Sequence, residues 1–495
     1  MTSTPSYGCS DDSSDYSRTQ SEPKNHTVYD IANHTWQFPP LEIARMLSPK
    51  KPKPHTEPTA ELLLQHQYDY VVDRPAFQNA LEDVVTRLVN DATSISQSFD
   101  LHDLAVLLTR CIEACHDALD KQQDIPLRQG RWYGNLQFTV RNAPADRSRK
   151  SARRKSLIIG AHRLSGGGNE VLCGDSPEGK PADRLTLPVE AKGSWQETVT
   201  HSSDDARCLF NTNKIRSFAL VLAFNQDERA LRFLIFHHSG LTASEPCNVT
   251  TPGGLREVAR LFLVLTSWST PGDAGFVPSC TDTMSAFPAD RLGKDYALAA
   301  SDGVLSWSLR LRGRMTLVSR LRLLQGSSVE GEFSWIASQS YADPPTGGKA
   351  SHDAQHSEVK YVQPIKTIHS DNSPILPEVV VMKTSWPDAS RRGKEAAMYR
   401  ASGGLFGTIP HICSYEGVGE HREVISNVLF LPCDGDIAKY HWPIFSSDPP
   451  EKPDLRTLWF TICGVEGQSL VEATSPRQLS RAWVHFVLGA SVSAL

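Results

Sequence analysis

The spacing of apolar residues divides the chain into stretches of different character. Residues 1–58 lack periodic apolar positions and are rich in Ser, Thr, Asp, Pro and Lys. A segment of this composition buries too little apolar surface to offset the entropy lost on ordering, so it is predicted to be disordered. Residues 59–125 carry apolar side chains at helical spacing, and Asp100 is suited to cap a second helix. This part is predicted to be a helical segment.

Residues 126–275 are predicted to form an α/β module, because stretches with strand character alternate with helical ones. The predicted strands are Trp132–Val140, Ser156–Ile159, Leu185–Ala191, Phe218–Phe224 and Leu231–Phe236. The predicted helices are Ser203–Ile215 and Leu255–Trp268.

Residues 276–495 are predicted to form a second, strand-rich domain. Its predicted strands are Leu305–Arg312, Met315–Leu324, Glu378–Met382 and Thr457–Cys463. Helices are predicted at Arg391–Ala401 and at Ser475–Leu488, where a serine cap is followed by proline. The long polar stretch Gln339–Pro377 is typical of an insertion loop. The fold class predicted for the whole chain is therefore multidomain, α+β with an α/β part.

Composition and charge narrow the range of functions. The formal net charge of −5 over 495 residues argues against nucleic-acid binding along the whole chain, but leaves open a local patch such as the basic run 147–155. The N-terminus has no basic or apolar signal region, and the longest apolar run, near Leu261–Leu265, is far too short for a membrane span. We therefore expect an intracellular protein, in the cytoplasm or nucleus, without a membrane partner. The ten cysteines form no C-x-x-C pair, so no structural metal site is predicted.

A lysine and a glutamate carry the most informative chemistry. Lys383 follows a predicted buried strand, and Glu395 lies early in the helix that comes next. Protein kinases need this arrangement, because the strand lysine holds the α- and β-phosphates of ATP and the helix glutamate orients the lysine through an ion pair. A lysine at the end of a strand is also commonly just solvated, so the pair alone leaves both interpretations open.

Four longer stretches resemble successive blocks of the fungal-type protein kinase family: VMKTSWPD, RRGKEAAMYR, ISNVLFLP and RTLWFTICGVEGQSLVEATSPRQLSRAWVHFVLG. Upstream, LRGRMTLV at residues 311–318 is similar to the glycine-rich strand turn of that family, usually G-R-G-T-x-V. The resemblance extends through VEAKGSW and covers residues 130–490. It implies a protein-kinase-like small lobe with the start of a large lobe, preceded by a restriction-endonuclease-like module.

The resemblance also assigns roles to individual residues. It implies an ATP-binding set that consists of Gly313, Thr316, Val318, Lys383 and Glu395. It puts the hinge backbone, which contacts adenine, at Cys463–Val465. Met315 stands where the family usually has a second glycine, and its Cβ hinders close approach of the backbone to phosphate. Binding of ATP as a cofactor is therefore expected to be weak.

The catalytic residues of a kinase are not found in this sequence. A kinase uses an Asp to accept the proton of the substrate hydroxyl, and an Asn and a second Asp to hold Mg²⁺. The family supplies them in an H-R-D-x-S-x-x-N stretch and a later Asp-containing motif, and neither occurs here. The chain is expected to stop before the catalytic loop, as a truncated kinase or a pseudokinase-like protein. We expect no catalytic residue, doubtful binding of Mg²⁺ and no phosphotransfer, and the protein substrate or partner is unknown.

The α/β module carries a second candidate site. Glu190 and Lys192 form an E-x-K stretch on a predicted strand, and the alternation of a strand puts both side chains on one face. In restriction-endonuclease-like folds an upstream Asp and this Glu bind Mg²⁺ while the Lys activates water, and Asp183 is an upstream candidate. Relatives commonly have Pro-Asp where this chain has Ser156–Leu157, so cleavage of DNA is not expected. A salt bridge at the strand end is the alternative interpretation.

Further alternatives stay open. The module could bind nucleic acid, with the kinase-like part as a regulator, or the chain could be a non-enzymatic interaction protein that uses both parts. His237 and His238 follow a predicted strand and could bind a metal or respond to pH, although a turn with solvated imidazoles is the simpler expectation.

Overall fold

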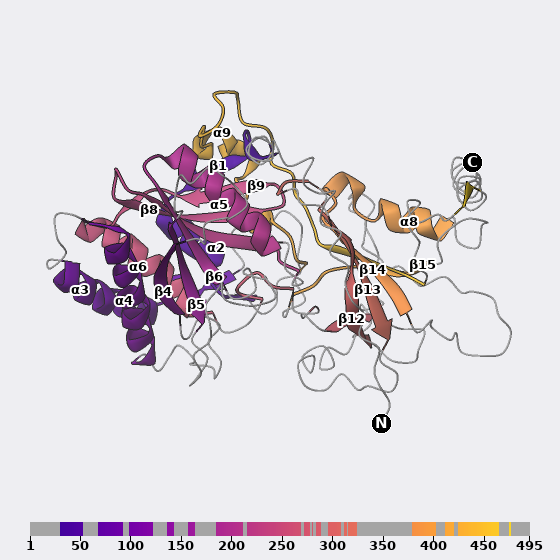
Figure 1. The fold of residues 1–495 in the computed structure, drawn as a ribbon, viewed down its shortest axis with the longest axis horizontal. Helices are drawn as coiled ribbons and strands as arrows, with labels where there is room; N and C mark the ends of the chain where they lie inside the picture. Colours follow the sequence, from indigo (N-terminus) through magenta and orange to yellow (C-terminus); the bar gives the residue numbers. More distant parts are fainter. Residues whose placement is uncertain are drawn as a thin grey trace, which may run out of the picture.

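The computed structural model describes residues 30–52, 68–92, 99–121, 136–142, 157–163, 185–210, 215–268, 272–277, 280, 284–288, 296–307, 311–313, 315–323, 379–401, 411–419, 424–464 and 475–476. An eight-stranded and a six-stranded sheet organise these residues, and helices accompany each of them (Figure 1). The fold is thus α+β, in agreement with the multidomain class predicted from the sequence. None of the helices in these ranges is long and apolar enough to cross a membrane.

The eight-stranded sheet is the centre of the first part. In spatial order its strands are β1 (Thr35–Phe38), β9 (Gly240–Ser244), β8 (Ala230–His237), β7 (Phe218–Asn225), β6 (Leu185–Lys192), β5 (Leu157–Arg163) and β4 (Leu136–Asn142), and β10 (Cys247–Asn248) pairs with β8. Neighbours are antiparallel except for the pairs β1–β9 and β6–β7. The parallel pair β6–β7 requires a crossover, which α5 (Trp195–Phe210) supplies. Every residue of β7 and β8 is buried, as expected of strands covered on both faces.

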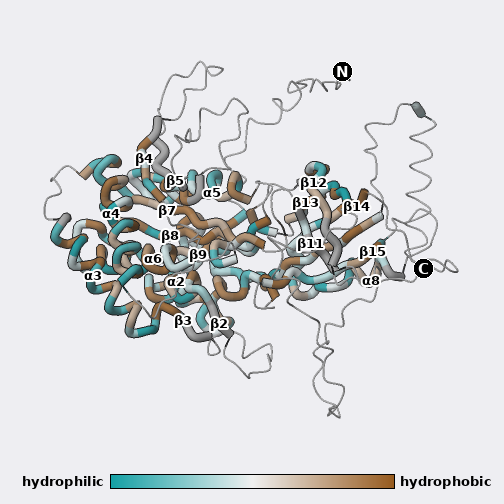
Figure 2. Tube along the Cα trace, turned by 90° about the horizontal axis from the view of Figure 1, so that it is seen from below, coloured by the Kyte–Doolittle hydropathy of each residue, from teal (hydrophilic) through white to brown (hydrophobic). Residues whose placement is uncertain are grey.

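Helices cover both faces of this sheet. One face packs against α2 (Pro40–Leu47), α3 (Pro75–Ala92), α4 (Leu101–Asp120) and α6 (Pro252–Thr266). α5 covers the opposite face, where Ala206 and Leu209 join a second buried cluster. Asp100 caps α4, as predicted, by accepting hydrogen bonds from the N–H groups of His102 and Asp103 at 2.8 and 2.9 Å. Figure 2 shows the apolar residues concentrated along the central strands, with polar positions on the outer turns of α3 and α4.

The prediction of disorder at the N-terminus is wrong in part. The segment predicted to be disordered, residues 1–58, is ordered at 30–52, where β1 pairs with β9 and Trp36 is fully buried. A short antiparallel pair follows, β2 (Lys50–Pro52) with β3 (Tyr68–Tyr70), and η3 (Val71–Asp73) leads into α3. The helical character predicted for residues 59–125 is present in α3 and α4, which share one apolar core with α6 and the sheet. Strands as short as β1, β2 and β3 have little stability of their own, so packing against distant partners orders them.

The six-stranded sheet is the centre of the second part. In spatial order its strands are β11 (Met284–Pro288), β12 (Tyr296–Trp307), β13 (Thr316–Leu323), β14 (Val379–Ser385), β16 (Trp459–Cys463) and β15 (His411–Glu416), and all neighbours are antiparallel. The turn η6 (Ala389–Arg391) and α8 (Lys394–Ala401) follow β14. The predicted strand Leu305–Arg312 overlaps only the last residues of β12, which begins at Tyr296, and Leu311 and Arg312 lie in a bend. The strand β15 is not among the predicted strands. The predicted helix Ser475–Leu488 lies outside the described residues beyond its first two.

The connection between β15 and β16 reaches back to the first sheet. We call residues 424–458 of this connection the arm; it contains η7 (Val428–Phe430), η8 (Asp434–Asp436) and α9 (Ile437–Tyr440). Phe430 enters the core on one face of the eight-stranded sheet, and Trp442 enters the core on the other. The N–H of Trp442 donates to the carbonyl of Thr35 at 2.9 Å, and α9 lies beside β1 (Figure 1). The arm therefore ties the two sheets together.

Candidate functional site

Lys383 lies on β14, between the strands β13 and β16. Its cross-strand partners are Val318 on β13 and Thr461 on β16. Directly opposed residues project to the same face of a sheet, and Thr316, two positions before Val318, shares that face. The opposite face carries the buried apolar cluster with Met382 and Phe460 next to these positions. Three of the predicted ATP-binding residues, Thr316, Val318 and Lys383, are thus collected on one face.

Glu395 approaches Lys383 from the helix that follows the strand. It lies in the first turn of α8, and its carboxylate forms an ion pair with the ammonium of Lys383. The exposed fractions of the two side chains are 24% for the lysine and 22% for the glutamate, so the pair is only partly screened by water. The helix begins after Gly393, whose φ of 71° is a left-handed conformation that suits glycine. The ion pair predicted from the sequence is present.

Two contacts hold α8 against the edge of the sheet. The guanidinium of Arg392, just before the helix, donates to the carboxylate of Glu416 on β15 at 2.6 Å. The ring of Tyr399 on α8 stacks on His411 of β15, with ring centroids 5.4 Å apart and planes inclined by 3°. Because both contacts fix the helix, they also fix the position of Glu395.

A row of polar groups lies next to Lys383 that the sequence pattern does not indicate. The hydroxyl of Ser414 on β15 donates to Oγ1 of Thr461 on β16 at 3.1 Å, and it lies 2.8 Å from Nε2 of His411. All three residues are buried. Thr461 is embedded in the apolar sequence of β16, so its place beside Lys383 becomes visible only from the register of the two strands.

The end of β16 is where the resemblance puts the adenine-contacting hinge. Cys463 and Gly464 are described, whereas Val465 lies outside the described residues. Burial raises the pKa of the Cys463 thiol to about 11, and the charge of Lys383 acts in the opposite direction. The thiol is therefore protonated at neutral pH, and it lies within the electrostatic reach of the lysine.

The turn between β12 and β13 contacts the first sheet. We call residues 311–315 the glycine turn; Arg314 in it is not described. Gly313 has a φ of 113°, and its N–H donates to the carbonyl of His238 at 3.0 Å. Met315 has a φ of 21°, so this position keeps a backbone conformation that favours glycine although a Cβ is present. Leu311 is buried in the cluster on the α5 face of the eight-stranded sheet. The glycine turn thus lies between the two sheets.

Glu190 and Lys192 share one face of β6, as predicted, and their charged groups are 2.7 Å apart. Val189 belongs to the core on the other face, so the pair faces α5. Burial and the neighbouring charge of Glu190 raise the pKa of Asp205, on α5, to about 8. The sequence pattern does not indicate Asp205, because its approach to Glu190 depends on how α5 packs on β6.

The other residues expected at this second site are not among the described ones. Asp183, Ser156 and the basic run 147–155 lie outside them. On β5 the register sets Ile159 opposite Val189, so this strand offers the apolar stretch Leu157–Ile159 beside Glu190. Within the described part of the chain, no group of three or more His, Cys, Asp or Glu side chains is arranged to hold a metal ion.

His237 and His238 are not solvated, contrary to the simpler expectation. Both are fully buried at the end of β8. His237 stacks between Trp36 and Phe430, with ring centroids at 6.0 and 5.8 Å, and His238 packs on Trp386 at 4.1 Å. Burial lowers the pKa of each histidine to about 3. The imidazoles are therefore neutral packing residues where the two sheets meet.

Comparison of the chain with known protein families, with curated proteins and with solved structures finds no match. A functional assignment therefore rests on the residues themselves and on their geometry.

Proposed function

We propose that the chain is a nucleotide-binding, protein-kinase-like protein of the fungal-type kinase family, and that this chain by itself transfers no phosphate. The observation that carries the proposal is the ion pair between Lys383 and Glu395. In kinases a strand lysine holds the ATP phosphates and a helix glutamate orients that lysine. Here the same two residue types come from a strand and from the next α-helix along the chain.

The order of the surrounding elements supports the same function. The hairpin β12–β13 precedes the lysine strand and is connected through Gly313. β14 with Lys383, α8 with Glu395, and then β15 and β16 follow along the chain. A kinase small lobe needs a glycine-rich turn over the phosphates, a strand lysine and a helix glutamate, and this order supplies the three in turn. Thr316 and Val318 would line the nucleotide from the face that carries the lysine.

Catalysis needs more than this nucleotide site. The Asp that accepts the substrate proton, and the Asn and Asp that hold Mg²⁺, have no counterpart in this sequence. Without them the electrostatic stabilisation that dominates phosphoryl transfer is missing. The proposed function is therefore nucleotide binding.

Titration calorimetry with ATP tests the proposal. Lys383→Ala removes a charge-assisted contact to phosphate and should weaken binding by about tenfold or more. The matched control is Lys394→Ala, which removes an exposed lysine at the start of α8, next to Glu395, and should leave the affinity unchanged. Absence of ATP binding, or equal affinities in the wild type and Lys383→Ala, would contradict the proposal.

Asp205 favours a second candidate function, nucleic-acid binding by the α/β module as a nuclease-like domain. Together with Glu190 and Lys192 it brings two carboxyl groups and an amine to one side of a sheet, as phosphodiester-cleaving sites do. The neighbouring strand offers no carboxylate beside Glu190, so we propose binding without cleavage. Thermal stabilisation by DNA or RNA that is lost in Lys192→Ala would support this function, and stabilisation by neither would exclude it.

A further inference from the structure

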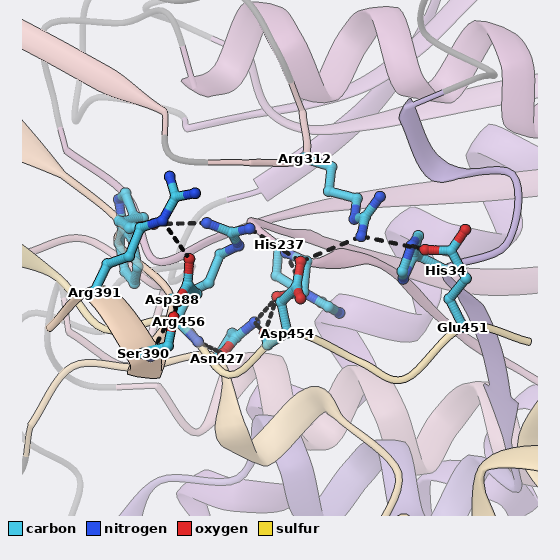
Figure 3. A network of polar contacts seen from close by, with 12 residues as sticks. His34, His237, Arg312, Asp388, Ser390, Arg391, Asn427, Glu451, Asp454 and Arg456 are labelled. Carbon is cyan, nitrogen blue, oxygen red and sulfur yellow. Dashed lines mark hydrogen bonds and ion pairs between the residues drawn. The ribbon is translucent and has the colours of Figure 1, made fainter.

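Three consecutive residues of the glycine turn contact the α/β module or the arm. The N–H of Gly313 donates to the carbonyl of His238 at 3.0 Å. The guanidinium of Arg312 reaches the carboxylate of Asp454, on the arm, at 3.2 Å (Figure 3). Leu311 is 1% exposed and belongs to the core under α5. The turn thus contacts the module and the arm through a backbone donor, a cation and an apolar side chain.

The arm holds Asp454 in place. Arg456 donates to the carboxylate of Asp454 at 3.0 Å, and the side-chain amide of Asn427 donates to its carbonyl at 3.1 Å. Arg456 also donates to the carbonyl of Trp386, directly after β14, at 2.9 Å. Figure 3 shows this network continuing through Arg312 to Glu451 and His34. The acidic partner of the glycine turn is therefore a fixed feature of the arm.

The carbonyl acceptor on the module is fixed as well. The His238 ring is packed between Phe210 and Trp386, at centroid distances of 4.9 and 4.1 Å, and its Nε2 lies 3.3 Å from the carbonyl of Arg216. Residues 237–239 are fully buried. The docked position of the glycine turn is thus defined from both sides by groups that packing and hydrogen bonds hold in place.

A nucleotide would need the same turn. Kinases cover the ATP phosphates with the backbone of this turn, and backbone N–H groups are its donors to phosphate oxygens. One N–H cannot satisfy a phosphate oxygen and the His238 carbonyl together. This inference rests on the proposed nucleotide site at Lys383. We propose that docking of the glycine turn on the α/β module and binding of nucleotide phosphates at Lys383 exclude one another. The module and the arm thus form an autoinhibitory cover. The apparent association constant for nucleotide equals the intrinsic constant multiplied by the fraction of molecules in which the turn is undocked.

Release of the turn tests this inference in the full chain, with ATP as the probe. Asp454→Asn removes the charge that holds Arg312, so ATP should bind about fivefold more tightly. Arg312→Gln removes the same ion pair from the other side and should shift the affinity in the same direction. The matched control is Asp434→Asn, also on the arm, whose carboxylate pairs with Lys452 at the surface, 2.8 Å away, and whose ATP affinity should equal that of the wild type.

Hydrogen exchange followed by mass spectrometry provides a second measurement. Saturating ATP should speed amide exchange around Asn427 and Arg456 and in residues 237–241, because the turn leaves these surfaces. Slower exchange there in the presence of ATP would show that nucleotide and docking favour each other, and would overturn the inference. This measurement also decides the question if Asp454→Asn does not fold.

The outcomes separate this inference from the proposed function. If the wild type and Asp454→Asn bind ATP equally, and each loses binding when Lys383→Ala is added, the exclusion is wrong and the nucleotide site stands. If neither protein binds ATP, the proposed function falls and the exclusion falls with it. If Arg312→Gln binds ATP more weakly while Asp454→Asn is unchanged, the arginine serves the phosphate and the exclusion is overturned.

Discussion

His238 and Trp386 pack on each other between the two sheets, with ring centroids 4.1 Å apart and planes inclined by 35°. His238 follows β8 of the eight-stranded sheet, and Trp386 follows β14, the strand that carries Lys383. Both residues are buried. The lysine strand is therefore seated on the α/β module through an aromatic contact.

Trp386→Ala should destabilise the chain, because it removes a large buried ring from the apolar cluster of the six-stranded sheet and from the His238 contact. The expected loss is about 3–5 kcal/mol. Calorimetry should show the six-stranded part unfolding in an earlier, separate transition. Trp386→Phe keeps an aromatic ring, so its loss of stability should be much smaller. An alanine variant with a single transition at the wild-type temperature would show that the contact does not couple the two parts.

Acid should destabilise the contact between the sheets. Burial holds the pKa of His237 and His238 at about 3, whereas an unfolded histidine titrates near pH 6.5. Between these values the unfolded chain binds protons and the folded chain does not, so stability falls as pH drops from about 6.5 towards 3. Buried groups that face the two rings include Trp36, Thr242 and Phe430. The charge of Arg456 lowers the pKa of His238 further, and His34 and His238 do the same for His237.

His237→Phe tests this pH dependence. The variant keeps the stack between Trp36 and Phe430 but cannot titrate, so its melting temperature should fall less than that of the wild type between pH 7 and pH 5. Between pH 7 and pH 5 the wild type should lose at most about 2 kcal/mol more of its free energy of unfolding than the variant loses. His102→Gln, at an exposed histidine of α4, should follow the wild-type curve. Identical curves for all three proteins would contradict the prediction.

Asp205→Asn should stabilise the chain at alkaline pH. Burial next to Glu190 raises the pKa of Asp205 to about 8, so the folded state keeps a proton that the unfolded chain releases near pH 4. Stability therefore falls as pH rises from about 4 to 8, and an asparagine avoids this loss. At pH 9 the variant should melt at least about 2 °C above the wild type, and near pH 4 the two should coincide.

The control for this prediction is Asp204→Asn, at the neighbouring position of α5, where 48% of the side chain is exposed. The charge of Asp204 contributes to the raised pKa of Asp205, but less than burial and Glu190 do, so at pH 9 the melting temperature of Asp204→Asn should stay closer to that of the wild type than the melting temperature of Asp205→Asn does. A wild type that is more stable than Asp205→Asn at pH 9 would show that the ionised carboxylate is used, for example to hold a cation with Glu190.

Met315→Gly should strengthen ATP binding. The φ of 21° at Met315 favours glycine, and removal of the Cβ lets the backbone approach phosphate. The effect on stability should be small, because relief of backbone strain opposes the loss of the methionine side chain, which packs against two apolar clusters. Met315→Ala is the matched control, since it loses the side chain but keeps the Cβ. Equal ATP affinities of the two variants would refute the role of the Cβ.

The chain by itself should incorporate no phosphate, either into itself or into general protein substrates. A nucleotide site is proposed, but the sequence has no H-R-D stretch to supply the proton acceptor and no second motif to clamp Mg²⁺. Incubation with radiolabelled ATP and Mg²⁺ measures this directly. Incorporation above background that disappears in Lys383→Ala would contradict the prediction and would require an unrecognised metal ligand.

Elements with a long periodic pattern or a local chemical signal were predictable from the amino-acid sequence. The apolar runs of β7 and β8 and the Asp100 cap of α4 could be read directly, because one stretch of chain contains the whole signal. The contact of Lys383 with Glu395 was predictable for the same reason, since 12 positions separate a strand end from the start of the next helix. Strand boundaries such as those of β12 were less accurate, because the predicted strand extends into the glycine turn, where the apolar Leu311 is buried although it lies in a bend.

The tertiary structure alone decided which residues meet where the two sheets join. Thr35 and Trp442 are 407 positions apart, and nothing in the four residues of β1 or in the polar sequence of the arm indicates that they pair. The burial of His237 and His238, the approach of Asp205 to Glu190, and the contact of Gly313 with His238 have the same origin. Hydrophobic periodicity encodes which face of an element is buried, but it does not encode the partner that covers that face. The partner is selected when the whole core packs, because short polar segments gain stability only from contacts that distant parts of the chain supply.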